Sequence, residues 1–347
     1  MLKRHILFLL LLLLSTKNFA QLKPEEQKSE EPSSLVKWMT LKEAQDANKV
    51  KPKPILLDFY TSWCGWCKVM MRSTYSDPGL ASYINNWFYP VKFNAETKDT
   101  VYYRDTMYVN KSEGARPPHD LAIKFLGGNM SYPSTVFVTN NYQYALTTAG
   151  YLDVKTIEPI LIYVNEYVFR SAGYEDFKTN FSKTFYDTIP SEKKDSIEWL
   201  SFNQALEKNK KKPKKKIIPV YTNWCISCKV QKETSFSDSS FIKYVKDNFY
   251  MIDFTADSKD TITYNDAVFS NTNNGFHPLL NKLTNNNLTL PTILILDENN
   301  ERIDAIPFYL TPQSVNPVLH YYGSNEYKKK TWEEFAKEFS GNKAPSH

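Results

Sequence analysis

Residues 55–68 read ILLDFYTSWCGWCK, and the fold of the first half of the chain can be worked out from this stretch. The apolar run 55–60 predicts a short buried strand that leads directly into the pair Cys64 and Cys67. Residues from Gly65 to about Ser73 predict a helix, so Cys64 lies where the strand gives way to the helix. Because a helix N-terminus stabilises negative charge, this position favours the thiolate form of Cys64.

The same pattern recurs 161 positions later in the chain. The matched segments are KWMT at 37–40 with EWLS at 198–201, and WCGWCKV at 63–69 with WCISCKV at 224–230. After a short change in length the offset becomes 158, which pairs His119 with His277 and Pro133 with Pro291. A repeat of this length predicts two copies of one domain.

The end of the repeat indicates where the domains meet. Asn165-Glu166-Tyr167 echoes Asn325-Glu326-Tyr327, and two aromatic triplets follow: Tyr174, Phe177 and Phe181, then Trp332, Phe335 and Phe339. Both triplets have the i, i+3, i+7 spacing of an apolar helix stripe, which predicts a terminal helix in each domain. We therefore predict a signal peptide at 1–20, a flexible spacer at 21–34, a first domain at 35–183, a linker at 184–194, a second domain at 195–341 and a tail at 342–347.

The first twenty residues predict an export signal. Lys3 and Arg4 precede the apolar run 6–14, and Ala20 is the candidate cleavage position. The apolar run is shorter than the roughly 20 residues that a membrane-spanning helix needs, so an uncleaved anchor is only the alternative interpretation. Without Lys3, Arg4 and Lys17 the net charge falls from +5 to about +2, which is too near neutral to indicate a nucleic-acid or membrane partner.

Helical and strand patterns alternate along the first domain. The expected elements are helices at 41–48, from Asp77-Pro78 onward and at 119–126, and strands at 55–60, 87–93 and 135–138. Gly127-Gly128 would end the helix before it. This alternation predicts an α/β fold in which helices flank a central mixed sheet.

The four cysteines form two pairs, Cys64 with Cys67 and Cys225 with Cys228. A structural disulfide framework would close long loops, whereas a spacing of two residues closes almost none. Half a zinc site is a further alternative, but zinc needs four ligands, and the two pairs are 161 residues apart. The spacing therefore favours thiol–disulfide exchange, more firmly for the first pair than for the second.

Strand, Trp-Cys-X-X-Cys-Lys, helix and a distant X-Pro-Ser/Thr together resemble the thioredoxins, and the resemblance covers both repeats. The Gly-Trp dipeptide between Cys64 and Cys67 resembles exported bacterial thioredoxin-like proteins and the terminal domain of membrane-linked disulfide-reducing systems. The resemblance implies two tandem thioredoxin-like domains in which Pro133 and Pro291 are cis. It also implies that substrates bind along Trp63, Trp66, Tyr132 and Pro133 in the first domain, and along Trp224, Leu290 and Pro291 in the second.

By the same resemblance, Asp58 accepts the proton of the resolving cysteine, Cys67, through water. A place on a solvated strand edge is the alternative for Asp58. The second domain departs from the pattern, because Pro219 stands at the equivalent position and Ile226-Ser227 lies between its cysteines. We expect His119 and His277 to be helix caps or surface residues, and the basic run 208–216 to be a solvated loop, with a polyanion contact as its alternative.

These features predict an exported, periplasmic thiol–disulfide oxidoreductase that reduces or isomerises protein disulfides without a nucleotide, metal or other cofactor. Its expected partners are disulfide-containing protein substrates and a membrane-linked or soluble dithiol donor, with no nucleic acid and no membrane span in the mature chain. Two alternatives remain at this stage. One is a peptide-binding or chaperone module whose disulfides stay closed, and the other is an electron relay between the two domains.

Overall fold

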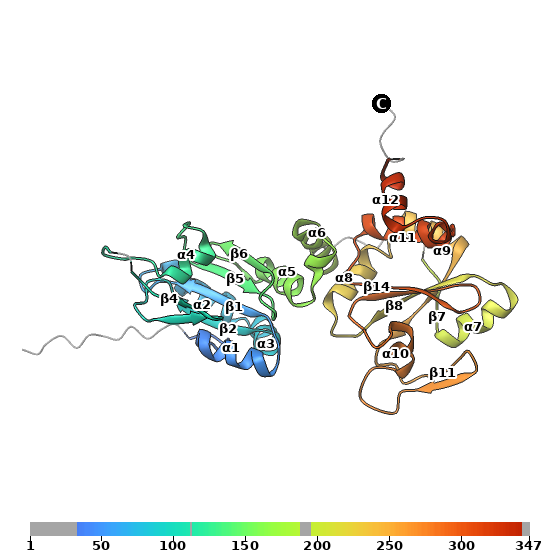
Figure 1. Ribbon diagram of the computed structural model, residues 1–347, viewed down its shortest axis with the longest axis horizontal. Helices are drawn as coiled ribbons and strands as arrows, with labels where there is room; N and C mark the ends of the chain where they lie inside the picture. The colour runs from blue at the N-terminus through green and yellow to red at the C-terminus, as the bar shows by residue number, and fades with distance from the viewer. Residues whose placement is uncertain (1–32, 112, 188–195, 342–347) are drawn as a thin grey trace, which may run out of the picture. The chain divides into compact units, whose positions relative to one another are not determined.

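The computed structural model describes residues 33–111, 113–187 and 196–341, and Figure 1 shows its ribbon. The predicted signal peptide, nearly all of the spacer, most of the linker and the tail lie outside the described residues. The two larger sheets of the described residues belong to one unit, Ser34–His347. Within the described ranges, no helix is both long and apolar enough to cross a membrane.

The first sheet is mixed and has the strand order β2-β1-β5-β6. Its strands are β1 (Ile55–Tyr60), β2 (Tyr89–Asn94), β5 (Ser134–Val138) and β6 (Ala145–Ala149). The central strand β1 runs parallel to β2 and antiparallel to β5. A separate hairpin consists of β3 (Val101–Tyr103) and β4 (Thr106–Tyr108). This mixed sheet confirms the predicted fold class.

Helices surround this sheet, and their ends follow the capping signals in the sequence. They are α1 (Leu41–Val50), α2 (Gly65–Arg72), η1 (Thr74–Ser76), α3 (Pro78–Trp87), α4 (Asp120–Leu126), α5 (Val154–Asn165), η2 (Val168–Arg170) and α6 (Tyr174–Phe185). Asp77 caps α3 through the backbone N–H of Leu80, and Gly127 ends α4 at a φ of 60°. The expected strand at 87–93 begins too early, because Trp87 is still the last residue of α3.

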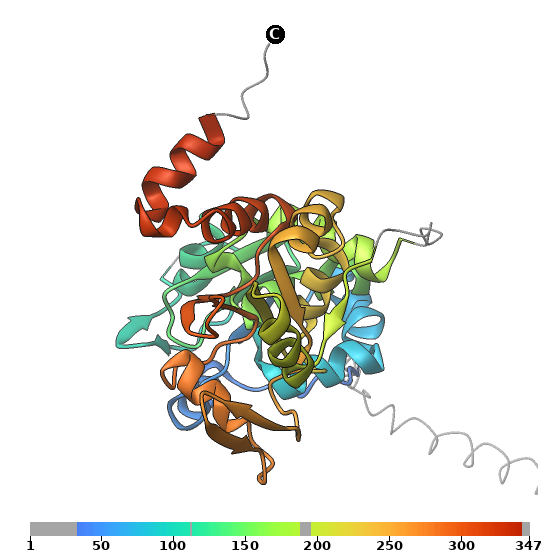
Figure 2. The ribbon, with the colours of Figure 1, turned by 90° about the vertical axis from the view of Figure 1, so that its right-hand side faces the viewer.

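The second sheet repeats the arrangement of the first, with the order β14-β13-β8-β9-β7 and β10 beside β8. Its strands are β7 (Trp199–Leu200), β8 (Lys215–Tyr221), β9 (Phe249–Ile252), β10 (Phe254–Thr255), β13 (Thr292–Leu296) and β14 (Arg302–Pro307). Strand β8 corresponds to β1, since it also runs parallel to one neighbour, β9, and antiparallel to the other, β13. The hairpin of β11 (Thr261–Tyr264) and β12 (Ala267–Ser270), in orange, projects from this domain (Figure 2).

The helices of the second domain correct one expectation about the register of the repeat. They are α7 (Phe202–Lys211), α8 (Ile226–Thr234), α9 (Ser239–Asn248), α10 (Pro278–Thr284), α11 (Pro312–Gly323), η3 (Glu326–Lys328) and α12 (Trp332–Gly341). Glu166 is the C-cap of α5, and the matching C-cap of α11 is Ser324. The Asn-Glu-Tyr echo is therefore out of register by two residues, and Glu166 has no carboxylate counterpart in the second domain.

The basic run 208–216 is not a solvated loop. Its first residues end α7, and Lys215 and Lys216 lie in β8 with 3% and 0% of their surface exposed. The ammonium group of Lys215 pairs with the Glu298 carboxylate at 2.7 Å, and that of Lys216 donates to the carbonyl oxygen of Asp297 at 2.9 Å. The methylene groups of a lysine can pack in a core when its ammonium group pairs with a carboxylate or a carbonyl oxygen. The pattern of charges along the sequence does not reveal such partners.

Helix α6 is the predicted terminal helix of the first domain, and it extends into the predicted linker through Phe185. Its stripe residues Phe177 and Phe181 are buried in one apolar cluster with Val230 of α8 and with Tyr309. The rings of Phe177 and Tyr309 meet edge to face, with centroids 5.3 Å apart. The last helix of the first domain therefore packs against the helix that carries the second cysteine pair.

Candidate redox sites

The first cysteine pair lies at the start of α2. Cys64 is the N-cap of this helix, and its sulfur accepts a hydrogen bond from the backbone N–H of Cys67 at 3.0 Å. The two sulfurs are joined in a disulfide with Cα atoms 5.4 Å apart. Both cysteines are buried, while Trp63 and Trp66 beside them are exposed. The strand-to-helix position predicted for Cys64 is therefore confirmed.

Aromatic rings line the surface next to this pair. The Trp63 ring meets the Tyr132 ring edge to face at 6.1 Å, and its indole N–H donates to the Glu96 carboxylate at 3.0 Å. Tyr132 precedes Pro133, and the bond between them is cis, as the resemblance implied. The Trp66 ring lies 5.6 Å from that of Tyr151. Trp63 and Tyr132, two of the expected substrate-binding residues, thus come together on one surface.

Asp58 is buried in the middle of β1, with 1% of its surface exposed, so the solvated-edge alternative is wrong. Its register neighbours are Lys92 on β2 and Thr135 on β5. The hydroxyl of Tyr75 donates to Oδ1 at 3.2 Å, whereas Oδ2 has no hydrogen-bond partner among the described residues. Burial raises the pKa of Asp58 to about 7, although the Tyr75 hydrogen bond and the Lys92 charge act in the opposite direction. A carboxyl of this kind can take up a proton near neutral pH.

The second cysteine pair repeats this local geometry at the start of α8. Cys225 is the N-cap, and its sulfur accepts a hydrogen bond from the backbone N–H of Cys228 at 3.3 Å. The pair is closed as a disulfide, and both cysteines are buried. The bond between Leu290 and Pro291 is cis, as expected. Trp224 is half exposed, but its ring stacks on Trp87 of α3, with centroids 5.9 Å apart.

The space behind the second disulfide differs from that behind the first. Pro219 stands where the first domain has Asp58, and Gln231 of α8 replaces Met70 of α2. The Gln231 side chain is buried, and neither its amide nitrogen nor its oxygen has a hydrogen-bond partner in the described part of the chain. It lines a cavity of about 150 Å³ together with Pro219, Cys225 and Cys228. This polar group cannot take up a proton at neutral pH, unlike a carboxylate. Alignment of the two repeats at offset 161 is the signal that would have drawn attention to it.

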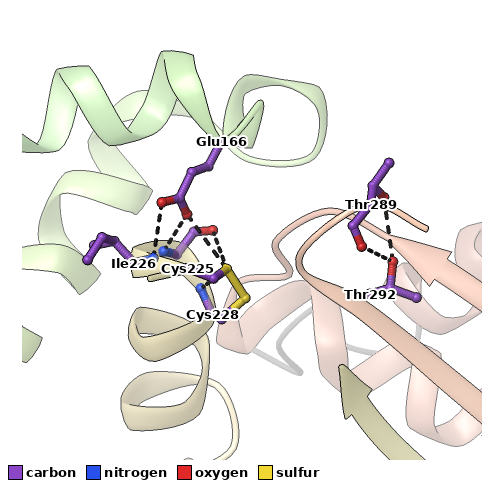
Figure 3. The surroundings of a disulfide bond; sticks show 7 residues. Glu166, Cys225, Ile226, Cys228, Thr289 and Thr292 are labelled. Carbon is purple, nitrogen blue, oxygen red and sulfur yellow. Dashed lines mark hydrogen bonds between the residues drawn. A yellow bond between two sulfur atoms is a disulfide. The ribbon is translucent and has the colours of Figure 1, made fainter. Parts of the chain in front are cut away.

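Glu166 of the first domain contacts the second cysteine pair directly (Figure 3). The backbone N–H of Ile226 donates to Oε1 at 3.0 Å, and that of Ser227 donates to Oε2 at 2.7 Å. The sulfur of Cys225 lies 3.8 Å from Oε2. Burial raises the pKa of Glu166, while its bonds to Ser227 and Ile226 act in the opposite direction. The sequence did not point to Glu166, because its hydrogen bonds to Ile226 and Ser227 depend on how the two domains pack.

Other expected residues have structural roles. His119 and His277 cap α4 and α10: each accepts a backbone N–H at Nδ1, from Leu121 at 3.1 Å and from Leu279 at 3.2 Å. These hydrogen bonds confirm the predicted caps, and the full burial of both residues excludes the surface position. The turn before Pro291 is closed by Thr292, whose hydroxyl donates to the carbonyl oxygen of Thr289 at 2.7 Å (Figure 3).

Comparison with known protein families gives one match for each domain. Residues 25–161 match the family Thioredox_DsbH, described as "Protein of unknown function, DUF255". Residues 202–323 match the family Thioredoxin_2, described as "Thioredoxin-like domain". The two matches together cover well over half of the chain, and each contains one of the cysteine pairs.

A search of curated proteins gave no match. Among solved structures, the chain is similar to a DsbH oxidoreductase, with 14% identity over 40% of this chain and 93% of that one and a TM-score of 0.28. It is also similar to a thioredoxin-fold protein from Helicobacter pylori, with 16% identity over 46% of this chain and 90% of that one and a TM-score of 0.29. A third similar structure is the reduced C-terminal domain of DsbD from Neisseria meningitidis, with 20% identity over 36% of this chain and 93% of that one and a TM-score of 0.26. At these scores the structural likenesses carry no weight for the activity.

The family matches, the repeated mixed sheet and the two Cys-X-X-Cys pairs at helix N-termini agree with one another. At a general level they support thiol–disulfide oxidoreductase chemistry. The chain belongs to the thioredoxin-like superfamily and has two thioredoxin-like domains.

Proposed function

We propose that this protein is an exported protein-disulfide oxidoreductase that reduces or isomerises substrate disulfides at Cys64 and Cys67. The observation that carries the proposal is the position of Cys64 at the open start of α2. No side chain of the described residues hydrogen-bonds to the backbone N–H of Gly65 or Trp66. These groups and the helix dipole are therefore free to stabilise a thiolate at Cys64.

The reaction begins when the Cys64 thiolate attacks one sulfur of a substrate disulfide. A bond forms between Cys64 and that sulfur, and the other substrate sulfur leaves as a thiolate. Cys67 then attacks the sulfur of Cys64, which releases the second substrate sulfur and closes the Cys64–Cys67 disulfide. Two electrons pass to the substrate, and a dithiol donor protein returns two electrons to the pair.

Asp58 serves the second step. Cys67 must lose its proton before it attacks, and a buried carboxyl with a pKa of about 7 can accept that proton near neutral pH. Water would carry the proton between the two groups. The exposed rings of Trp63 and Trp66 and the backbone of Tyr132 form the surface on which a substrate segment would lie.

Reduction of insulin disulfides tests the proposal. Cys64→Ser abolishes the activity, and Cys67→Ser accumulates a mixed disulfide between Cys64 and the substrate, which mass spectrometry detects after acid quenching. Cys225→Ser is the matched control and keeps the activity of the first site. Full activity in Cys64→Ser would contradict the proposal.

Export belongs to the same proposal, on the evidence of Lys3, Arg4 and the apolar run 6–14. The mature chain then acts in the periplasm, where disulfide-containing substrates and a membrane-linked or soluble dithiol donor are available. Mass spectrometry of the protein recovered from a periplasmic fraction gives its first residue. Recovery of the intact N-terminus in the cytoplasm would contradict export.

A further inference from the structure

Helices α2 and α8, which begin at the two cysteine pairs, differ in the acceptors of their first backbone N–H groups. In α8 the N–H groups of Ile226 and Ser227 both donate to the carboxylate of Glu166 (Figure 3). In α2 the corresponding groups belong to Gly65 and Trp66, and no carboxylate of the described chain accepts from them. Glu166 thus takes the donors that would stabilise a thiolate at Cys225.

The charge of Glu166 acts in the same direction as its hydrogen bonds. Its Oε2 lies 3.8 Å from the sulfur of Cys225, and a negative charge at this distance opposes a second one on the sulfur. Burial raises the pKa of Glu166, and the two backbone bonds oppose this by stabilising the ionised carboxylate. A proton shared between Glu166 and Cys225 is therefore expected to stay on the sulfur.

Further contacts join the two domains on the side of α8 where Glu166 lies. Trp87 of α3 stacks on Trp224, the residue before Cys225, with an angle of 29° between the rings. The ammonium group of Lys229 lies over the ring of Phe185 at 4.8 Å. Ser171 donates a hydrogen bond from its hydroxyl to the carbonyl oxygen of Tyr309. The domains therefore pack together here, and the two backbone hydrogen bonds from Ile226 and Ser227 fix the Glu166 carboxylate at the start of α8.

The expected substrate-binding positions of the second domain border the contact between the domains. A cleft of about 500 Å³ is lined by residues of both domains, among them Trp87, Glu166, Trp224 and Leu290. The sequence predicts that a substrate segment binds at Trp224 and Leu290 in the second domain. A segment that contacts both residues therefore lies along this cleft, close to Glu166.

We propose that Glu166 restrains the second Cys-X-X-Cys pair, holding Cys225 as an unreactive thiol whenever that pair is reduced. The first domain thereby suppresses exchange at the second site while its own site stays open. This inference goes beyond the proposed function, which concerns Cys64 and Cys67. It requires only that a dithiol reagent can deliver two electrons to the Cys225–Cys228 disulfide and so form two thiols.

Alkylation of Cys225 tests the restraint directly. In the full chain carrying Cys64→Ser and Cys67→Ser, dithiothreitol reduces the second pair and is then removed. Iodoacetamide then forms a carbon–sulfur bond at the thiolate and releases iodide, and mass spectrometry follows each cysteine separately at pH 7. We expect Glu166→Gln to raise the rate at Cys225 about tenfold, because the gain in thiolate exceeds the loss in nucleophilicity.

Glu326→Gln is the matched control, since Glu326 pairs with Lys329 and Lys330 and should leave the rate at Cys225 unchanged. An equal rise at Cys225 and Cys228 in Glu166→Gln would overturn the proposal, because it would report loosened packing rather than the loss of one charge. An unchanged rate would also overturn it. A lower rate would overturn it in favour of Glu166 as a base that activates Cys225. None of these readouts depends on insulin reduction, so they stand apart from the test of the first site.

Discussion

Tyr75 donates a hydrogen bond to Oδ1 of Asp58 at 3.2 Å, and both side chains are almost fully buried. This hydrogen bond stabilises the carboxylate and opposes the effect of burial, which raises the pKa of Asp58 to about 7. Tyr75 therefore sets the pH range in which Asp58 can accept a proton from Cys67, although the tyrosine lies outside the cysteine motif.

Tyr75→Phe removes this hydrogen bond without changing the shape of the ring. The pKa of Asp58 should then rise above 7, and the pH at which insulin reduction reaches half its maximal rate should rise by about one unit. A pH–rate profile of both proteins measures this shift. An unchanged midpoint would show that Asp58 does not limit the reaction.

Asp58→Asn should stabilise the protein at high pH. A carboxyl whose folded pKa is about 7 binds its proton more tightly when folded than when unfolded, where the pKa is near 4, so it lowers stability as the pH rises from 4 to 7. At pH 8 the variant should gain on the order of 2 kcal/mol in the free energy of unfolding, and almost nothing at pH 4. Urea unfolding at both pH values measures the difference.

Asp46 provides the control for this experiment, because it is exposed and its hydrogen bonds to Lys42 and Lys49 lower its pKa to about 2. Asp46→Asn should not stabilise the protein at pH 8. A gain equal to that of Asp58→Asn would mean that burial of the charge is not the cause.

Lys216→Ile should also be stabilising, since isoleucine is the residue at the matching position 55. Burial lowers the pKa of Lys216 to about 8, so the folded state holds this proton less tightly than the unfolded state does. The resulting penalty is present at pH 7 and disappears as the pH rises from 8 to above 10. We expect a gain of about 1–2 kcal/mol at pH 7 in urea unfolding.

The exposed Lys210 is the matched control, and Lys210→Ala should change little. A loss of stability in Lys216→Ile would instead show that the bonds from its ammonium group to the carbonyl oxygens of Asp297 and Glu298 outweigh the burial of the charge.

Gln231→Met places the first-domain residue behind the second disulfide. The buried amide of Gln231 has no partner among the described side chains, so an apolar group of similar size should raise the free energy of unfolding by about 1 kcal/mol. Thermal or urea unfolding measures this gain. The opposite result, a loss of stability, would indicate that water in the cavity satisfies the amide.

Local signals in the sequence predict most of the fold and the positions of Asp58, Cys64 and Cys67 in the first site. The run 55–68 specifies a strand, a turn and a helix N-terminus, and residues close together in sequence determine each of these elements. Asp77 and Gly127 mark helix ends in the same local way. The predicted burial of Asp58 was correct because its neighbours along β1 are apolar on both sides.

The features that were missed depend on contacts between distant segments. In the sequence, nothing distinguishes Glu166 from other glutamates at helix ends, because its role depends on the packing of α8 beside it. The Asn-Glu-Tyr repeat also suggested Glu326 as its counterpart, whereas the structure places Ser324 at the matching position. The buried Lys215 and Lys216 escaped notice because their partners, Glu298 and Asp297, lie more than eighty residues away. Charge patterns along the chain cannot reveal such partners.

The packing of α6 makes each half of the chain depend on the other. Phe177 and Phe181 are enclosed partly by Val230 and Tyr309, so a cut between the domains would leave an aromatic face bare on one fragment and an unfilled hollow on the other. Neither half is then a self-contained module that could be exchanged between proteins. We expect the intact chain to melt in a single calorimetric transition, and the isolated halves to aggregate.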